Sequence, residues 1–204
     1  MTDQQVRDEV MTLFMAGHET TAVVLSWTWY LLARYPDVDA RLTEELRRVV
    51  GGRAPSFADL PKLTYAEMVI TESRRLYPPA DGIGRQAVRP TEVAGYPVAS
   101  GTIVVVPTWV VHRDGRWYAD PETFRPERWV DEGSPRRPRF AYFPFGGGPR
   151  QCIGSAFAMM EAVLLVASLA KDFRLSLVPG QRVILTPYGT LRPEPGIQMR
   201  LARR

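Results

Sequence analysis

The chain contains a single cysteine, Cys152, which lies near the end of a glycine-rich segment spanning residues 143–154. A lone thiol can serve as a small buried hydrophobe, as a nucleophile or as a metal ligand. The three consecutive glycines at 146–148 allow backbone conformations and close approaches that side chains forbid, so the segment can lie flat against a planar ligand. Arg150 places a positive charge two residues before the thiol, where it can hold an anionic group.

The alternatives for Cys152 differ in what else they require. A zinc site takes three or four protein ligands, but besides this cysteine the chain offers only two histidines, His18 and His112. A nucleophile would need one of these histidines as its base, and a core thiol would need no glycine loop. An apolar helix predicted for residues 154–170 follows the thiol, and its unpaired N–H groups favour a thiolate. The combination favours a thiolate ligand to haem iron.

Glu72 and Arg75 are three residues apart in a predicted helix, so they share one face of it. Such a pair is commonly exposed and then adds little to stability. Here apolar residues surround the pair, so one face of the helix must be buried, and Arg128 can satisfy the remaining carboxylate lone pairs. We therefore predict a buried network of Glu72, Arg75 and Arg128, which would be costly to break.

Residues 16–21 of the first predicted helix have the sequence AGHETT. A glycine such as Gly17 costs about 1 kcal/mol relative to alanine in a helix, and the hydroxyl of Thr20 can bond back to an upstream carbonyl. Together they indicate a kink or a groove in the helix. Glu19 and Thr20 offer a carboxylate and a hydroxyl side by side, which is the form of a proton relay, although both residues also suit an ordinary helix.

His112 follows a short apolar run and has two interpretations. It is either a structural residue that makes hydrogen bonds or a donor to an anionic ligand group. The second interpretation predicts that it acts together with Arg85 and Arg150.

The elements that must position these residues follow from apolar periodicity and breaker residues. The first helix is apolar nearly all round in its C-terminal half, so we expect it to be buried. Pro36 ends it, Asp37 caps the next helix, and a pair of glycines stops that one. The predicted helices are 4–34, 37–50, 65–76 and 154–170. The predicted strands are 83–88, 92–94, 102–106, 173–178, 182–186 and 196–201.

Residues 113–150 are rich in proline, glycine, arginine and aromatic residues and show little periodicity. Long segments of this kind in compact domains are usually functional or disordered, and the aromatic content favours an ordered one. The order of the elements is helices, strands, this segment, a helix and strands. It predicts an α+β fold that is mainly α with small β-sheets.

Composition bounds the class of protein. The chain has 204 residues, of which 45% are hydrophobic and 24% charged, so it is globular and forms one sizeable domain or two small ones. No apolar run approaches the roughly 18 residues of a membrane span, and the charged first ten residues are unlike a signal peptide. A single cysteine excludes an intramolecular disulfide and fits a reducing compartment. We expect a cytoplasmic protein without a membrane anchor.

The net charge is +4, and part of this excess of positive charge comes from basic residues near the glycine-rich segment and at the C-terminus. This excess forms either a solvated face or a docking face for an acidic protein. No signature of nucleic-acid binding accompanies it, so we expect no nucleic-acid partner. The basic residues concerned are Arg136, Arg137, Arg139, Arg150, Arg200, Arg203 and Arg204.

Taken together, these residues make the chain resemble the C-terminal half of a cytochrome P450, a haem-thiolate monooxygenase. The resemblance covers essentially the whole chain and rests on motifs that occur in the family's order and spacing. These motifs are residues 16–21 with Glu19 and Thr20, Glu72-x-x-Arg75, residues 126–129 with Arg128, and Phe145-x-x-Gly148-x-Arg150-x-Cys152-x-Gly154.

The resemblance implies a haem b cofactor (iron protoporphyrin IX) with Cys152 as the proximal iron ligand. It implies that Phe145, Gly148 and Gly154 belong to the haem-binding segment, and that Glu19 and Thr20 deliver protons. By the same resemblance, the haem propionates are held by His112, Arg85 and Arg150.

The implied reaction inserts one oxygen atom of dioxygen into a small hydrophobic organic substrate. No flavin or nicotinamide fingerprint appears, so electrons would come from a separate acidic protein, a ferredoxin, flavodoxin or reductase. The basic stretch 136–150 would dock this donor. We expect the substrate pocket to be lined by Ala16, Thr20, Ala80, Asp81 and Tyr188.

We expect residues 1–204 to form the C-terminal portion of this fold, from its long central helix onward, with the N-terminal half absent. The resemblance implies a fold of roughly twice this length, in line with the scaling of domain size. The alternative function is a truncated, non-catalytic chain that binds haem weakly or not at all.

Overall fold

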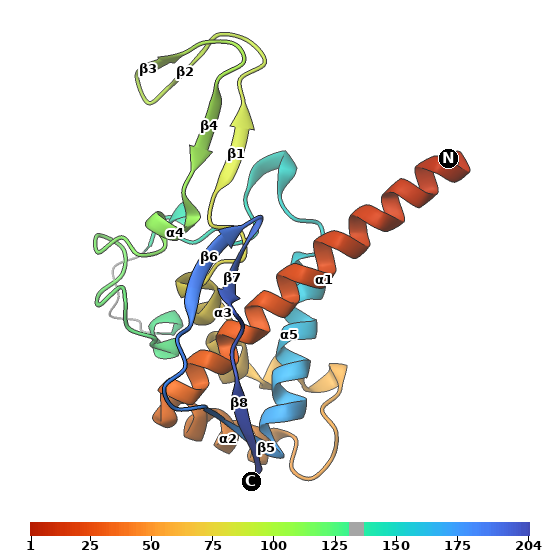
Figure 1. The fold of residues 1–204 in the computed structure, drawn as a ribbon, viewed down its shortest axis with the longest axis vertical. Coiled ribbons are helices and arrows are strands. Elements are labelled where there is room, and N and C mark those ends of the chain that lie inside the picture. Colours follow the sequence, from red (N-terminus) through yellow and green to blue (C-terminus); the bar gives the residue numbers. More distant parts are fainter. Residues whose placement is uncertain (131–136) are drawn as a thin grey trace.

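The computed structural model describes residues 1–130 and 137–204, which form helices and small sheets (Figure 1). The helices are α1 Asp3–Arg34, α2 Pro36–Val49, α3 Thr64–Leu76, α4 Thr108–Val111 and α5 Ser155–Ala170. The strands are β1 Ile83–Gln86, β2 Thr91–Val93, β3 Tyr96–Val98, β4 Ile103–Val106, β5 Phe173–Leu177, β6 Ile184–Tyr188, β7 Thr190–Glu194 and β8 Met199–Arg203. Short 3-10 helices span Phe57–Lys62, Pro126–Trp129, Arg139–Ala141 and Gly148–Arg150. The predicted α+β class is confirmed.

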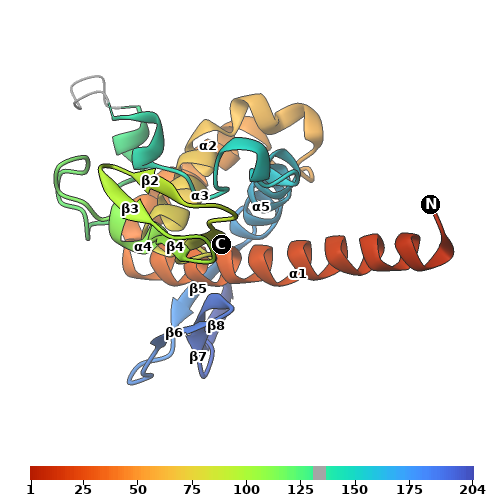
Figure 2. The ribbon, with the colours of Figure 1, turned by 90° about the horizontal axis from the view of Figure 1, so that it is seen from above.

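Helix α1 begins with a capping box, in which Thr2 accepts from the N–H of Gln5 and the Gln5 side chain accepts from the N–H of Thr2. Its C-terminal half is buried, as the apolar pattern predicts, with Trp27 and Leu31 among its least exposed residues. Its N-terminal half is exposed and extends away from the other elements (Figure 2). The cavity described below borders the middle of α1, between its exposed N-terminal half and its buried C-terminal half.

The hydrophobic core lies between the C-terminal half of α1 and helices α2, α3 and α5. Leu42 and Leu46 of α2, Val69 of α3 and Val166 of α5 have no exposed surface. Burying side chains of this size completely stabilises the fold by about 1.5–3 kcal/mol each before entropy is counted. This core fixes α3 and α5, which carry or flank most of the residues that the sequence analysis singles out.

The strands pair as two-stranded antiparallel ladders, β1 with β4, β2 with β3, β5 with β8 and β6 with β7. The β6–β7 hairpin lies against α1, because the indole Nε1 of Trp27 donates to the carbonyl of Leu191 at 2.8 Å. The N–H of Leu191 in turn donates to the carbonyl of Pro79 at 2.9 Å. Strand β7 is therefore fixed both to α1 and to the turn that follows α3.

Most predicted helix limits agree with the structure to within one or two residues, but several details were wrong. Pro36 does not lie between two helices. It occupies the first position of α2, where its missing N–H costs nothing, so Asp37 lies inside the first turn and caps nothing. Helix α4 and strands β3 and β7 were not predicted, and the last predicted strand, 196–201, begins three residues and ends two residues before β8. Among the described residues, no helix combines the length and apolar character needed to cross a bilayer.

Candidate functional site

A cavity of about 710 Å³ lies between α1, the end of α3, the glycine-rich segment and the start of α5. This volume is within the range of about 300–1,000 Å³ that is typical of small-molecule and cofactor sites. The lining is largely apolar, with a few charged side chains. It includes Leu13, Ala16, Gly17, Thr20, Thr21, Val24, Arg74, Pro79, Ala80, Ile83, Arg85, Pro144, Phe145, Gly146, Arg150, Cys152, Ile153, Gly154, Phe157, Ala158, Glu161 and Ala162.

The glycine-rich segment presents the thiol of Cys152 to this cavity. The N–H of Cys152 donates to the carbonyl of Phe145 at 3.0 Å, which closes the segment into a compact loop. Gly146 and Gly148 have φ angles of +74° and +71°, a region that other residues rarely adopt. A Cβ atom on Gly147 would approach the ring of Phe140 to 2.6 Å, so a larger residue here would displace this exposed ring. Cys152 is a free, exposed cysteine that lines the cavity.

Thr20 brings a hydroxyl to the same cavity from α1. The hydroxyl donates to the carbonyl of Ala16 at 2.7 Å, one turn earlier in the helix. Apart from its chain neighbours and the backbone of its own helix, no described atom lies within 4 Å of the position that a Cβ of Gly17 would take. The helix runs without interruption through these residues, so they form a groove within a continuous helix.

Glu19, the neighbour of Thr20, is absent from the cavity lining. Its carboxylate accepts hydrogen bonds from the hydroxyl of Thr190 and from Arg192 Nη2, each at 2.6 Å. Both partners belong to β7, which the sequence analysis did not predict. The two residues predicted to act as a relay therefore point to different surroundings.

Three arginines line the cavity, and the sequence analysis predicted two of them, Arg85 and Arg150. The third, Arg74 of α3, was not predicted, because nothing in the sequence shows that it reaches the cavity while its neighbour Arg75 joins the buried network. Consecutive helical residues point about 100° apart, so Arg74 reaches a different side of α3. Glu161 is the only carboxylate among the described lining residues, so the cavity carries an excess of positive charge.

The structure does not bring His112 to this cavity. Its side chain has no exposed surface, and its Nε2 atom accepts from the N–H of Phe143 at 2.9 Å. Burial, together with the positive charge of Arg75, lowers the pKa of His112 to about 3, so the imidazole is neutral at pH 7. These contacts are those of a structural residue that supports the start of the glycine-rich segment.

Glu72 lies at the centre of a buried ionic network. It forms two hydrogen bonds of 2.9 Å with Arg75, and its Oε1 atom accepts from Arg128 Nε at 2.7 Å. Glu72 and Arg75 have no exposed side-chain surface, and that of Arg128 is 1% exposed. The indole of Trp129 adds a further hydrogen bond to Glu72 at 3.0 Å, which the sequence analysis missed.

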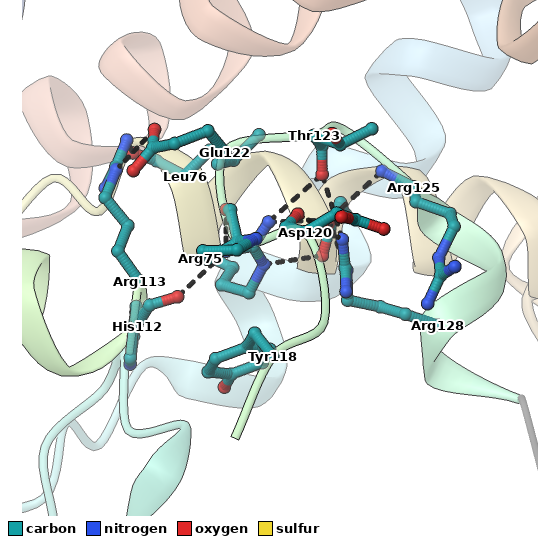
Figure 3. Close-up of polar contacts among 12 residues, drawn as sticks. Arg75, Leu76, His112, Arg113, Tyr118, Asp120, Glu122, Thr123, Arg125 and Arg128 are labelled. Atoms are coloured by element: carbon teal, nitrogen blue, oxygen red, sulfur yellow. Dashed lines mark hydrogen bonds and ion pairs between the residues drawn. The ribbon is translucent and has the colours of Figure 1, made fainter. Parts of the chain in front are cut away.

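The two arginines of the network also hold main-chain carbonyls (Figure 3). Arg75 donates to the carbonyls of His112 and Pro121, at 2.8 and 2.7 Å, and Arg128 donates to that of Thr123 at 3.0 Å. These bonds satisfy donors that would otherwise be buried without partners. The network thus fixes the irregular segment after α4 onto α3, and through His112 it supports the glycine-rich loop.

Other predicted positions fall into two groups. Ala16 and Ala80 line the cavity, whereas Asp81 and Tyr188 do not, and Tyr188 is 73% exposed. Tyr188 ends β6 and Gly189 follows it, so the tyrosine lies at the turn of the hairpin. Asp81 belongs to the turn that leads into β1, where its carbonyl accepts from the N–H of Trp109.

The expected basic face is only partly described. Arg136 lies outside the described residues. Arg137 donates to the carbonyl of Arg128 and lies over the rings of Tyr118 and Trp129, so it takes part in packing. Arg139 and Arg150 are exposed on either side of the glycines.

The family profile described as Cytochrome P450 matches residues 1–201. The chain is 42% identical over 195 residues to cyclooctatin synthase of Streptomyces melanosporofaciens, covering 96% of this chain and 42% of that protein. It is 43% identical over 201 residues to putative cytochrome P450 132 of Mycobacterium tuberculosis, covering 98% of this chain and 43% of that protein.

A third relative is cyclooctat-9-en-7-ol 5-monooxygenase of Streptomyces melanosporofaciens, which is 41% identical over 180 residues. The match covers 88% of this chain and 39% of that protein. The chain thus spans about two fifths of the length of these curated relatives.

Proposed function

The chain belongs to the cytochrome P450 family, and from this premise we propose that it supplies the haem-binding part of a monooxygenase. In this proposal Cys152 is the iron ligand and Thr20 lies on the substrate side. The observation that carries it is that one apolar cavity is lined both by an exposed thiol on a glycine-rich loop and by a hydroxyl from α1. The reaction is insertion of one oxygen atom of dioxygen into an organic substrate.

The donor set fits an iron porphyrin. Haem b is largely apolar, carries two carboxylates and would take a thiolate from the protein, and the cavity offers apolar walls, one thiol and several guanidinium groups. Arg85 and Arg150 would hold the propionates. His112 is a weaker candidate for this role, because it is buried away from the cavity.

Haem bound through a thiolate supplies the electron-rich iron that favours cleavage of the O–O bond. The protein's own contribution is orientation and proton transfer. Thr20 lines the cavity, and in this proposal its hydroxyl holds or passes a proton there, while the neighbouring carboxylate of Glu19 accepts one from solvent once Arg192 releases it. The apolar lining excludes water around the reacting atoms.

The same lining supports a small hydrophobic substrate, and one relative is named as the 5-monooxygenase of cyclooctat-9-en-7-ol. Electrons would come from an acidic donor protein, a ferredoxin, flavodoxin or reductase. Arg139 and Arg150 are exposed near the thiol loop, and a donor of opposite charge would be steered to them.

A spectrum tests the proposal. The chain is purified with haem, reduced and exposed to carbon monoxide, and we expect the strongly red-shifted Soret band of thiolate ligation. Cys152→Ser should lose this band, because an alcohol does not replace a thiolate as the axial ligand. Gln151→Ala is the matched control, since Gln151 is exposed in the same loop but does not line the cavity.

Absence of the band in the unmodified chain would contradict the proposal and favour a non-catalytic chain that holds haem weakly or not at all. A band that persists in Cys152→Ser would instead mean that another residue is the ligand.

A further inference from the structure

Arg74 is a buried cation whose surroundings offer it little compensation. Its residue surface is 5% exposed, and its Nε atom has no hydrogen-bond partner among the described residues. Its Nη1 atom lies 3.0 Å from the sulfur of Met159, which is a weak acceptor. Its guanidinium carbon lies 3.5 Å from the centre of the Phe145 ring, a close cation–π contact.

The contrast with its neighbour Arg75 shows that this environment is unusual. Arg75 has no exposed surface at all, but a carboxylate and several carbonyls satisfy its donors. Among the described residues no ion pair joins Arg74 to a carboxylate, although Glu161 lines the same cavity. A buried charge without a counter-charge destabilises a fold by several kcal/mol, so an apolar residue would be favoured here on stability alone.

Two side chains that can carry a negative charge act on Arg74, first the phenol of Tyr142 and then the thiol of Cys152, and of these two only Cys152 lines the cavity. Burial lowers the pKa of Arg74, whereas the charges of Tyr142 and Cys152 raise it. Arg74 and Cys152 line the same cavity, and they are joined through Phe145, whose ring lies against Arg74 and whose carbonyl accepts the N–H of Cys152. The arginine is thereby held at a fixed place beside the thiol loop.

We propose that Arg74 is a positioning residue for the thiolate, supplying the fixed positive charge that sets how strongly the Cys152 sulfur donates electron density to a bound iron. The inference rests on the proposed function. A positive charge beside the sulfur withdraws density from it and stabilises the reduced, less positive form of the iron. Arg74 therefore raises the reduction potential of the bound haem.

Arg74→Met in the haem-loaded chain tests this. Methionine fills similar space without charge, so we expect the thiolate Soret band to remain and the reduction potential to shift to a more negative value. Thermal unfolding of the haem-free chain should occur at the same or a higher temperature than in the unmodified chain, because an uncompensated buried charge has been removed. Arg74→Gln also lacks the charge and should shift the potential in the same direction, whereas Arg74→Lys keeps it and should shift the potential less.

Arg113→Met is the matched control. Arg113 is another largely buried arginine stacked on an aromatic ring, that of Trp109, but it does not line the cavity. It donates to the carbonyl of Leu76 and to Glu122, so its loss should lower the unfolding temperature and leave the potential unchanged.

The outcomes separate the two proposals. A thiolate band in the unmodified chain with an unchanged potential in both Arg74→Met and Arg74→Gln would overturn this inference alone. Loss of the fold in both variants would also overturn it, since Arg74 would then be a structural residue. Absence of the thiolate band in the unmodified chain would overturn the proposed function, and this inference with it.

Discussion

Glu19 of α1 is bound by Arg192 of β7, with 2.6 Å between the carboxylate Oε1 and the guanidinium Nη2. The two residues are 173 positions apart in the chain. Adjacent to Glu19, Thr20 lines the cavity. The pair therefore links the helix that borders the cavity to the C-terminal hairpin, and it keeps the carboxylate of the predicted relay occupied by a cation.

Arg192→Leu is expected to loosen the hairpin without unfolding the protein. The two side chains of the pair are 37% and 44% exposed, so solvent screens their attraction and the free energy of unfolding should fall by at most about 1 kcal/mol. For a chain of this size that corresponds to a melting temperature lower by about 2–4 °C. Hydrogen exchange of the β7 amides should become faster. Arg174→Leu, at an exposed position on β5, is the control, and a collapse of the whole fold in Arg192→Leu would contradict this account.

Glu72→Leu is expected to be among the most damaging single changes in the chain. It leaves Arg75 and Arg128 buried without their shared carboxylate, and breaking a buried ionic network in this way costs about 3–5 kcal/mol. Urea denaturation measures the loss as a lower midpoint. Glu44→Leu is the matched control, because Glu44 and Arg47 form an exposed pair at the same spacing. Glu44→Leu should unfold at the same urea concentration as the unmodified chain. A similar fall in the urea midpoint for Glu44→Leu and Glu72→Leu would show that burial of the network does not determine its contribution to stability.

The sequence predicts features that depend on local residue types and fails where distant segments meet. The limits of α3 follow from its own apolar pattern and from Pro78, and the loop before Cys152 follows from its glycines. The partners of Glu19 could not be predicted in this way, because nothing near Glu19 in the sequence indicates that β7 will lie against α1.

Arg74 and His112 show the same limitation in another form. Both are polar residues whose roles depend on burial, and burial is set by how the helices pack. Arg74 stands beside Arg75 in the sequence but reaches the cavity, and His112 stands between an apolar run and the charged residues Arg113 and Asp114 but is enclosed. From residue type alone, either side chain could have been structural or functional, and only the packing of the helices decides between the two.

The stability of the fold should depend on pH through His112. Burial lowers its pKa to about 3, whereas in an unfolded chain it is near 6.5. Between these values the unfolded state takes up a proton that the folded state does not, so the stabilisation is complete above pH 6.5 and is lost as the pH falls toward 3. The limiting slope is about 1.4 kcal/mol per pH unit.

His112→Gln removes this dependence and keeps an oxygen that can accept the N–H of Phe143. The difference in free energy of unfolding between the unmodified chain and this variant should narrow as the pH is lowered from about 7.5 to about 4.5. Carboxylates titrate in both proteins, so the comparison isolates His112. A difference that stays constant across this range would mean that the pKa of the imidazole is the same in the folded and unfolded states.

Thr20→Val tests the hydroxyl that α1 presents to the cavity, and it rests on the proposed monooxygenase function. Valine has the same shape, so the fold and the thiolate Soret band should be unchanged. Loss of a positioned proton donor should lower product formation by about 10²-fold, while electron consumption falls less. The measurement is product formed per electron supplied. Thr12→Val is the matched control, because the Thr12 hydroxyl makes the same bond, to the carbonyl of Asp8 at 2.8 Å, away from the cavity. Equal yields from Thr20→Val and Thr12→Val would show that the Thr20 hydroxyl serves the helix and takes no part in proton delivery.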